Sequence, residues 1–431
     1  MPTKAYTECL DAMFGMRRFG IILGLSTITN ILAGLGNPQQ RFSSIHIAGT
    51  NGKGSIASAI ATILQQAGYR VGLYTSPHLI RFNERICING TPITDDAVVA
   101  AWEAVKSVHH GNREPTFFEF STAMAFQAFG QGDVDYAVIE TGMGGRMDAT
   151  NVVKPLVSVI TNISLEHKTY LGSTIAAITG EKAGIIKPGI PVVTGVSQTK
   201  ARAVIEKAAS AQSSPLFMKS RDFNVRRTGD NRFSYRGIDH RWTGMRTSLL
   251  GGHQVDNASL TLAACELIMR RDNRLSRDHI QSGLIQNRWP GRLEVVSQRP
   301  YVILDGAHNL MAARRLSRFL QDNLAGRRIT MVAGILDDKP YSAILKDLVA
   351  PCARLILTRP KINRSLPPET LETAAKPLIS DIQIVADVGD AVRYAIATSK
   401  PDDAVCVAGS LYVIGEAKAA LEKSGEGLFQ I

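Results

Sequence analysis

Short apolar runs alternate with longer amphipathic stretches over most of the chain. Residues 45–49 (IHIAG) are apolar, residues 55–67 (SIASAIATILQQA) place apolar side chains at helical spacing, and residues 71–75 (VGLYT) return to an extended pattern. These three segments predict one β-α-β unit with a glycine-rich turn inside it. The other predicted elements of this part of the chain are strands at 136–140, 156–160 and 190–194, and helices at 119–129 and 200–211. The alternation predicts an α/β fold with a mainly parallel sheet covered on both faces.

A different pattern occupies residues 214–247. Polar and apolar positions alternate there around a turn at 226–231, and a helical pattern follows near 257–270. Alternation with a period of two is typical of a half-buried antiparallel strand. We therefore expect a small antiparallel excursion from the main sheet in this segment.

A proline-glycine pair inside NRWPGR (287–292) interrupts the chain, and the alternation of strands and helices restarts after it. We place a domain boundary near residue 290. The predicted domains are a larger P-loop-type domain at 1–289, which includes an N-terminal helical segment, and a smaller Rossmann-like α/β domain at 290–431. The second domain is expected to contain strands at 301–305, 328–334, 354–358, 382–387 and 404–408, and helices at 309–324, 340–349 and 389–398.

Composition changes this picture only through the charge. The chain has 431 residues, with 49 lysines and arginines against 38 aspartates and glutamates, so the formal net charge is +11. A basic balance favours anionic partners. The charges are dispersed, however, with no basic run longer than a residue pair. We therefore expect a small anionic substrate and no nucleic-acid partner.

The cysteines and the apolar segments indicate the compartment. Five cysteines are scattered along the chain without a CxxC pair, a pattern typical of reduced thiols in a cytoplasmic protein. Asp11, Arg17 and Arg18 interrupt the N-terminal segment, so no signal peptide is expected. No stretch of about 20 apolar residues occurs, and we expect no membrane partner.

The turn in the first β-α-β unit carries the clearest chemistry. The predicted strand runs into the segment 49–55 (GTNGKGS), and a helix follows at once. Glycines allow backbone N–H groups to turn toward a phosphate, and the helix N-terminus adds positive potential. Lys53 would reach the outer phosphates. The strict GxxxxGK[ST] pattern is not met, because Gly54 takes the hydroxyl position and the hydroxyl comes one residue late, at Ser55.

Three further strand ends carry candidate metal ligands. Glu140 ends an apolar strand and precedes a glycine-rich segment, an arrangement suited to Mg²⁺ beside a phosphate loop. His167 follows the next strand, and Ser76 follows the strand at 71–75. A solvated carboxylate and a structural histidine are the bland alternatives, and Asp148 can equally be a helix cap. We expect Lys53, Glu140 and His167 to meet at one edge of the sheet.

Together these segments resemble the folylpolyglutamate synthase/dihydrofolate synthase family of the Mur ligase superfamily. The likeness covers nearly the whole chain in one order, which makes the set specific although each motif is weak. The matching segments are GLSTITNILAGLGNPQ (24–39), IHIAGTNGKGS (45–55), YTSPHLIRFNERI (74–86), TFFEFST (116–122), ETGMGGRMDATN (140–151), TNISLEHKTYLG (161–172), EKAGIIKPG (181–189), GGHQVDNA (251–258), PGRLE (290–294), LDGAHN (304–309), GILDDK (334–339) and AGSLYVIGE (408–416).

The resemblance implies an ATP-dependent ligase that forms an amide through an acyl phosphate. L-Glutamate would be joined to dihydropteroate, to give dihydrofolate, or to the γ-carboxylate of a reduced folate. Members of the family use Mg²⁺, here two ions, and carry a carbamylated lysine, which corresponds to Lys182. Because an acyl phosphate hydrolyses in water, we also expect a cleft that closes between the two domains. We expect a monomer.

Residue roles carry over by position. The implied phosphate contacts are Gly52, Lys53, Gly54 and Ser55, and the further nucleotide contacts are Asn257, Arg292 and Asp305. The implied Mg²⁺ ligands are Ser76, Glu140 and His167, and the implied catalytic residues are Lys53, His167 and Lys182. The implied acceptor-binding residues are Thr116, Phe117, Phe118, Glu119, Met147, Asp148 and Ala149, with His308 and Ser410 as contacts of the incoming glutamate.

The sequence departs from the family pattern at one residue and in one short segment. Glu166 stands where many members have aspartate, and residues 15–18 (GMRR) fit the pterin-contacting region of bifunctional members poorly. The first alternative is therefore a folylpolyglutamate synthase without the dihydropteroate activity. A Mur-type ligase for another amino acid and a nucleotide-dependent module that binds nucleic acid are more distant alternatives.

Overall fold

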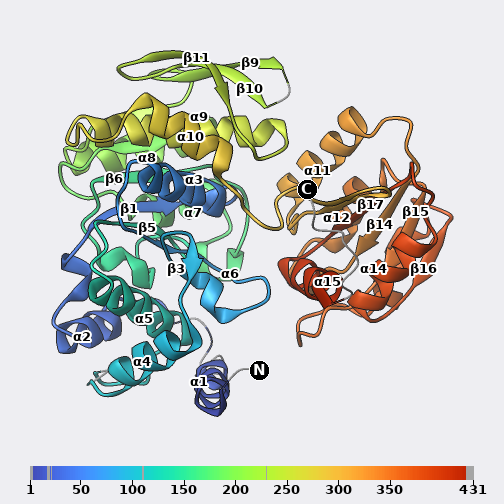
Figure 1. Ribbon diagram of the computed structural model, residues 1–431, viewed down its shortest axis with the longest axis horizontal. Coiled ribbons are helices and arrows are strands. Elements are labelled where there is room, and N and C mark those ends of the chain that lie inside the picture. The colour runs from blue at the N-terminus through green and yellow to red at the C-terminus, as the bar shows by residue number, and fades with distance from the viewer. Residues whose placement is uncertain (1–2, 17–19, 21, 109–110, 230, 424–431) are drawn as a thin grey trace. The chain divides into compact units, whose positions relative to one another are not determined.

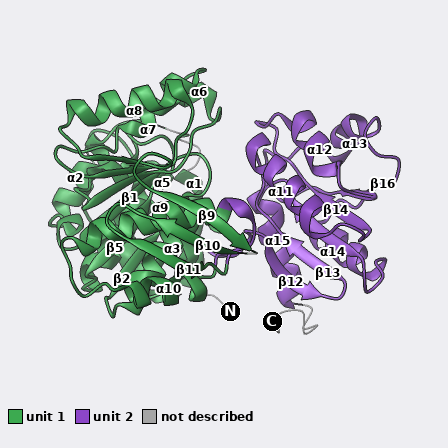
Figure 2. Cartoon of the chain, turned by 90° about the horizontal axis from the view of Figure 1, so that it is seen from above, with its two compact units in different colours: residues 1–78, 82–248, 254–288 green, residues 79–81, 249–253, 289–431 purple. Residues whose placement is uncertain are grey.

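The computed structural model describes residues 3–16, 20, 22–108, 111–229 and 231–423. The chain divides into two compact units (Figure 2). Unit 1 contains residues 1–78, 82–248 and 254–288, and unit 2 contains residues 79–81, 249–253 and 289–431. Residues 79–81 and 249–253 are surrounded in the sequence by residues of unit 1. They belong to unit 2 because they pack against its other residues. Leu79, for example, presents its carbonyl to Gly415, where an added Cβ would lie 2.0 Å away.

Unit 1 is built on an eight-stranded sheet with the order β4-β3-β2-β5-β1-β6-β7-β8 (Figure 1). From β2 to β8 all neighbours pair in parallel, and β3 and β4 form an antiparallel edge. The parallel arrangement predicted from the alternation is confirmed. The strands are β1 (Ser43–Ala48), β2 (Val71–Tyr74), β3 (Ile86–Ile88), β4 (Thr91–Pro92), β5 (Tyr136–Glu140), β6 (Val157–Ile160), β7 (Val192–Thr194) and β8 (Leu216–Met218).

Helices occur where they were predicted, at 55–67, 119–129, 200–211 and 257–270, and the unit also contains helices that were not predicted. Helix α3 contacts β1, β2 and β5, and α10 packs against α3. The helices are α1 (Lys4–Gly15), α2 (Ser26–Gly34), α3 (Lys53–Gln66), α4 (Asp95–Lys106), α5 (Phe117–Gln131), α6 (Lys168–Leu171), α7 (Ile175–Ala183), α8 (Thr199–Ala211), α9 (Gly252–Met269) and α10 (Arg277–Gln286), with short 3₁₀ turns η2 (Pro38–Gln40), η3 (Phe82–Arg85) and η4 (Ala149–Val152). Helix α9 begins within the segment 249–253 that packs with unit 2.

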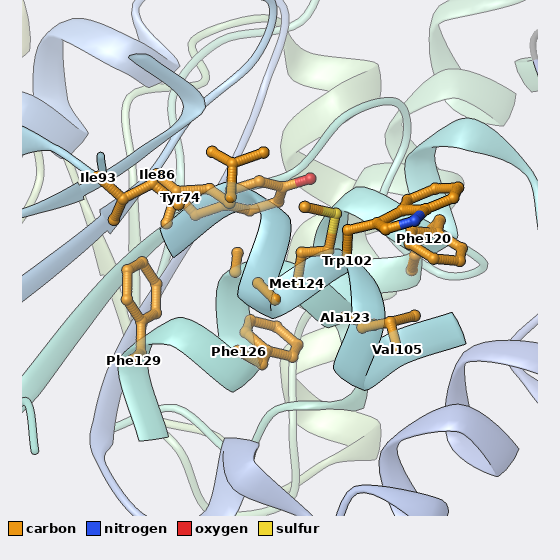
Figure 3. Close-up of a cluster of buried hydrophobic side chains, with 14 of the residues drawn as sticks. Tyr74, Ile86, Ile93, Trp102, Val105, Phe120, Ala123, Met124, Phe126 and Phe129 are labelled. Carbon is orange, nitrogen blue, oxygen red and sulfur yellow. The ribbon is translucent and has the colours of Figure 1, made fainter. Parts of the chain in front are cut away.

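A large hydrophobic cluster joins α1, α2, α4 and α5 to the sheet. Figure 3 shows the part of it that α4 and α5 form with Tyr74 and Ile86 of the sheet. Trp102 of α4 and Phe120 of α5 lie with ring centroids 4.5 Å apart, and Phe126 and Phe129 of α5 are fully buried. Burying an aromatic side chain of this size stabilises the fold by about 1.5–3 kcal/mol. The cluster therefore anchors α5, whose N-terminal end carries four candidate acceptor-binding residues.

The expected antiparallel excursion at 214–247 is wrong at its start. Strand β8 pairs in parallel with β7. Val192 N donates to Pro215 O at the start of this pairing, and Met218 of β8 is fully buried. Only the later part forms a separate three-stranded antiparallel sheet, with the order β11-β10-β9. Its strands are β9 (Asn224–Gly229), β10 (Arg232–Arg236) and β11 (Arg241–Arg246). In Figure 1 these strands lie over α9 and α10, on the side away from the main sheet.

Unit 2 contains a six-stranded sheet with the order β12-β13-β17-β14-β15-β16. All neighbours pair in parallel except β12, which is antiparallel to β13 and was not predicted. Helices α13 and α15 were also missed. The elements are β12 (Glu294–Gln298), β13 (Tyr301–Leu304), β14 (Ile329–Ala333), β15 (Arg354–Leu357), β16 (Ile382–Ile384) and β17 (Ala404–Ala408), with α11 (Leu310–Asn323), α12 (Tyr341–Val349), α13 (Pro368–Ala375), α14 (Val388–Ala397) and α15 (Leu411–Lys423). Within the described part of the chain, no helix is long and apolar enough to span a bilayer.

Candidate active site

The phosphate loop connects β1 to α3 and is tied to the strand beside it. Thr50 N donates to Asn162 O over 2.8 Å, and the side chains of Thr161 and Asn162 both donate to Asn51 O over 2.7 Å. Since Thr161 and Asn162 follow β6, the neighbour of β1, the sheet itself determines the position of the loop. The loop is therefore held without any contribution from a ligand.

Helix α3 begins at this loop with its amide groups free of a side-chain cap. Gly52 is the N-cap residue, has a left-handed φ of 89° and has no side chain to accept from the first turn. An added Cβ there would lie 2.6 Å from Asn257 Oδ1, so glycine is required by space as well as by conformation. Asn257 and Gln254, both of α9, lie against the loop, and Gln254 Nε2 donates to Ser55 Oγ over 3.4 Å. Uncapped amides at a helix N-terminus suit an anion.

Two lysine side chains converge on one carbonyl of the loop. Gly49 O accepts from Lys53 Nζ over 3.2 Å and from Lys182 Nζ over 2.8 Å. Lys182 belongs to α7 and its side chain is only 2% exposed. Burial lowers the pKa of Lys182, with a contribution from the charge of Lys53, while Glu166 opposes the shift. Two positive groups therefore lie beside the uncapped end of α3.

Glu166 is the partner of Lys182 that the sequence did not reveal. Its Oε1 accepts from Lys182 Nζ over 2.9 Å. Burial alone would raise the pKa of Glu166, but the charges of Lys182 and Lys53 outweigh burial and lower that pKa to about 2. The only sequence signal was its position directly before His167. His167 itself is exposed, with a left-handed φ of 47° as the residue that precedes α6.

Glu140 lies on the strand next to the loop. It ends β5, which pairs with β1, and its side chain is buried. Lys53 Nζ lies 3.8 Å from Glu140 Oε1, and Ser76 N donates to Glu140 Oε2 over 3.3 Å. The structure thus brings Lys53, Glu140 and Ser76 together, and His167 follows β6 at the same edge of the sheet. Among the described residues, no group of three or more His, Cys, Asp and Glu side chains forms a metal cage.

The start of α5 and the glycine-rich turn after Glu140 form a second group of candidate residues. Phe118 packs on Gly142, where an added Cβ would lie 2.4 Å from its ring. Phe117 stacks on Phe14 with ring centroids 5.8 Å apart, and the Arg85 guanidinium lies 5.1 Å from the Phe117 ring centroid. The two segments proposed to bind the acceptor therefore lie side by side in unit 1.

The carboxylates of this second group are already occupied by protein donors. Thr116 and Glu119 form a capping box at the start of α5, and Arg113 pairs with both oxygens of Glu119 at 2.9 and 2.6 Å. Asp148 accepts from Met143 N over 2.8 Å and from Thr150 Oγ1 over 2.5 Å. Burial raises the pKa of Asp148 and its hydrogen bonds oppose that shift.

The capping alternative for Asp148 is thus observed, since it accepts from Thr150 N as the cap of η4. The buried His46 extends this series of hydrogen bonds, because its Nε2 lies 2.8 Å from Thr150 Oγ1. The two neighbours of Asp148 face different surroundings: Met147 is 43% exposed, while Ala149 is buried. Arg17 and Arg18 lie outside the described residues.

The candidate residues of unit 2 gather at the end of β13. Asp305 is buried and accepts from Leu293 N over 2.9 Å and from Ala307 N over 3.0 Å. Burial raises its pKa, and the charge of Arg292 opposes the shift. His308 Nδ1 lies 2.8 Å from Gly306 O. Ser410 follows the adjacent strand β17, is buried, and accepts from Val413 N over 3.1 Å at the start of α15.

Comparison with known proteins identifies both units. Residues 47–265 match the Mur ligase middle domain, and residues 291–411 match the Mur ligase glutamate ligase domain. The dihydrofolate synthase/folylpolyglutamate synthase of Bacillus subtilis is 38% identical over 432 residues, covering 97% of this chain and 99% of the relative. A folylpolyglutamate synthase of Mycobacterium tuberculosis complexed with ADP and AMPPCP superposes with a TM-score of 0.88 at 31% identity, covering 96% of this chain and 98% of that one. E. coli FolC in complex with DHPP and ADP gives a TM-score of 0.89 at 28% identity, with the same coverage.

Proposed function

Because this chain belongs to the Mur ligase family and, within it, to the dihydrofolate synthase/folylpolyglutamate synthase group, we propose that it joins L-glutamate to dihydropteroate and to reduced folates at the expense of ATP. The γ-phosphoryl group of ATP passes to the acceptor carboxylate and gives an acyl phosphate and ADP. The amino group of glutamate then forms the C–N bond, loses its proton, and phosphate leaves.

One observation carries the proposal: Lys53 and Lys182 converge on Gly49 O beside the uncapped N-terminus of α3. Transfer of a phosphoryl group to a carboxylate brings several negative charges together, and positioned positive groups stabilise that charge as it moves. Backbone carbonyls of the loop hold the Lys53 ammonium beside the N-terminus of α3, where it would meet the transferring phosphate, and its Nζ lies 3.8 Å from Glu140 Oε1. The loop amides, Gly54 and Ser55 hold the remaining phosphates.

The residues around Glu140 fit Mg²⁺. This ion is usually held by one or two carboxylates together with substrate phosphates, so a site with a single buried carboxylate is sufficient. Ser76, Glu140 and His167 would hold the ion, which when bound neutralises charge on the phosphates. The proposal of a second ion depends on Lys182.

We extend the proposal to a carbamate on Lys182. The neutral amine would attack CO₂, form an N–C bond and release a proton, and the side chain would then carry a carboxylate beside the phosphate loop. Burial of the amine and its lowered pKa support this, since only the neutral form reacts. The 2.9 Å pair with Glu166 requires Glu166 to find another donor in that state. A ¹³C signal of the carbamate in the protein equilibrated with ¹³CO₂, absent in Lys182→Ala, tests it.

The acceptor would lie along the start of α5 and the glycine-rich turn after Glu140, both in unit 1. Phe117 and Phe118 offer aromatic surface for a pterin ring, and the segments 116–119 and 147–149 would surround it. The proposed roles in unit 2 are nucleotide contact for Arg292 and Asp305, and contact with the incoming glutamate for His308 and Ser410. In unit 1 Asn257 would also contact the nucleotide.

A coupled phosphate-release assay tests the function. Dihydropteroate, tetrahydrofolate and a no-acceptor control are each given with ATP, Mg²⁺ and L-glutamate. We expect glutamate-dependent phosphate release with both acceptors. Release with tetrahydrofolate alone would favour a folylpolyglutamate synthase without the dihydropteroate activity, and no glutamate-dependent release with either acceptor would contradict the proposal.

A further inference from the structure

The small antiparallel sheet of unit 1 has one apolar face and one face covered by arginine. Phe233, Tyr235, Trp242 and Met245 are buried on the inner face. Five of the exposed residues on these strands are arginines that lie between or beside the buried positions, together with the exposed Thr243 and Gly244 and the half-buried Ser234, none of which is basic. These arginines, here called the arginine face, are Arg226 of β9, Arg232 and Arg236 of β10, and Arg241 and Arg246 of β11.

Strand register places these arginines directly against one another. Arg232 pairs with Arg246, and Arg236 pairs with Arg241. Like charges directly opposite each other on a sheet destabilise it, by up to about 1 kcal/mol for a pair. Both ends of β10 therefore carry a like-charge cross-strand pair, which nothing in the fold of the sheet requires.

Two acids of the described residues beside this sheet are engaged with cations outside the arginine face. Asp239 pairs with Arg270 at 2.8 Å, and Asp256 pairs with Lys219 at 2.5 Å and with Arg227 at 3.4 Å. Within the ranges that the structure describes, none of the five arginines of the arginine face forms an ion pair. They belong to neither of the residue groups proposed for ATP and for the acceptor. A concentrated positive surface thus remains unexplained by the ligase reaction.

We propose that the arginine face binds the phosphate backbone of duplex DNA without reading its bases. The two arginine pairs stand four residues apart on β10, which is about 13 Å at the rise of an extended strand. The major groove of B-form DNA is about 12 Å wide, so one pair can meet each of the phosphate strands that border the groove. The planar, bidentate guanidinium suits phosphate oxygens, and the face carries no lysine.

The composition of the face argues against the other polyanions. No large exposed hydrophobic side chain lies on β9, β10 or β11 in the described residues, so the face has no anchor for a lipid surface. The same absence of exposed aromatic side chains removes the stacking platform that single-stranded nucleic acid requires. The major groove of A-form RNA is narrow and deep, and does not match the separation of the pairs. Although the linear sequence contains no basic run, folding assembles this cluster from three strands.

The test measures binding of a fluorescent DNA duplex of about two helical turns, roughly 21 base pairs. The full chain is compared with the variant R232Q/R236Q/R241Q/R246Q and with a control, K200Q/K207Q/R318Q/K346Q, that removes four exposed charges elsewhere. Four phosphate contacts predict a salt slope near −4 and a loss of affinity of roughly 100-fold between about 50 and about 200 mM salt. We expect the arginine-face variant to lose most of that slope, and the control to keep it.

Other outcomes would overturn the proposal. These are absence of duplex binding, equal loss in both variants, and preferential binding of an RNA duplex or of vesicles containing anionic lipid. Because the four arginines lie outside the proposed site, the variant keeps the ligase rate of the parent protein. A ligase assay on the same preparations therefore separates failure of this inference from failure of the proposed function, and also shows that the variant is folded.

Discussion

The two groups of candidate residues in unit 1 handle buried charge in opposite ways. Beside the phosphate loop, the Nζ atoms of Lys53 and Lys182 both donate to the carbonyl of Gly49, and the end of α3 has no side-chain cap. At the start of α5 and in the glycine-rich turn, Glu119 and Asp148 are surrounded by protein donors. The residues beside the phosphate loop retain positive potential for a ligand. The carboxylates of Glu119 and Asp148 instead stabilise the conformation of the start of α5 and of the glycine-rich turn. We expect substitutions in the first group to reduce turnover, and substitutions in the second to weaken acceptor binding and folding.

The largest effect is expected for Lys53→Ala. Removing the positive group that faces the transferring phosphate should lower kcat by about 1,000-fold or more, as for other single groups that stabilise charge in a transition state. The melting temperature should change little, because the ammonium hydrogen-bonds to backbone carbonyls of the loop and its distance to Glu140 is as long as 3.8 Å. Steady-state kinetics and thermal unfolding check both, with the exposed Lys200→Ala as the matched control. Near-normal turnover would remove Lys53 from the phosphate site.

Lys182→Ala should come next, with kcat lowered by about 100-fold. The variant leaves Glu166 partly buried without its ammonium partner, so some loss of stability is also expected. Added bicarbonate should not restore the rate, because alanine has no amine to carbamylate. A wild-type rate in Lys182→Ala would exclude a role for this lysine in the reaction. Glu166→Gln, which keeps the size of the side chain, separates the loss of the ion pair from the loss of the lysine.

Asp148→Asn should affect acceptor binding and stability, in contrast to the lysine variants, which should affect turnover. Asparagine keeps one oxygen, which can still accept from Thr150. The amide nitrogen that replaces the other oxygen cannot accept from Met143 N, so the turn loosens. We expect KM for the pterin acceptor to rise about 10-fold, KM for ATP to stay unchanged, and stability to fall by about 1–3 kcal/mol. Kinetics with each substrate varied in turn, together with urea unfolding, measure these effects. A loss confined to kcat would mean that the two groups do not differ in this way.

The smallest effect at neutral pH concerns His46. Burial, and secondarily the charge of Lys187, lowers the pKa of His46 from 6.5 to about 3. Below pH 6.5 the unfolded chain binds a proton that the folded chain refuses, so stability is full above that pH and falls as the pH drops toward 3. The linkage amounts to about 2–3 kcal/mol between pH 6.5 and pH 4.5.

Urea unfolding at several pH values measures this slope, and His46→Gln should flatten it. The range above pH 4.5 excludes most of the contribution of Glu166, whose pKa is lowered from 4.5 to about 2 and whose stabilisation is lost only below its unfolded value. An unchanged slope in His46→Gln would show that another group controls acid stability.

The sequence by itself determined most of the parallel strands and their order along the chain, although not β12, α13 or α15. The spacing of apolar residues placed β5 at 136–140 and β17 at 404–408 with the bounds that are observed, because strands buried on both faces read as continuous apolar runs. The same pattern placed Lys53 and Glu140 at strand ends. Parallel strands present their carboxyl ends at one edge, so the proximity of these two residues followed from topology.

Only the tertiary structure decided which side chains meet across elements. Glu166 pairs with Lys182 of α7, and His46 reaches Thr150, although neither contact leaves a periodic signal. The segment 216–218 joined the main sheet because a neighbouring strand offered a free edge, which no local propensity encodes. The arginines of β9, β10 and β11 are dispersed along the chain and become one surface only through strand register. Hydrophobic periodicity predicts whether a segment forms a strand or a helix and which of its residues are buried. Contacts between distant segments depend on the packing of the whole unit.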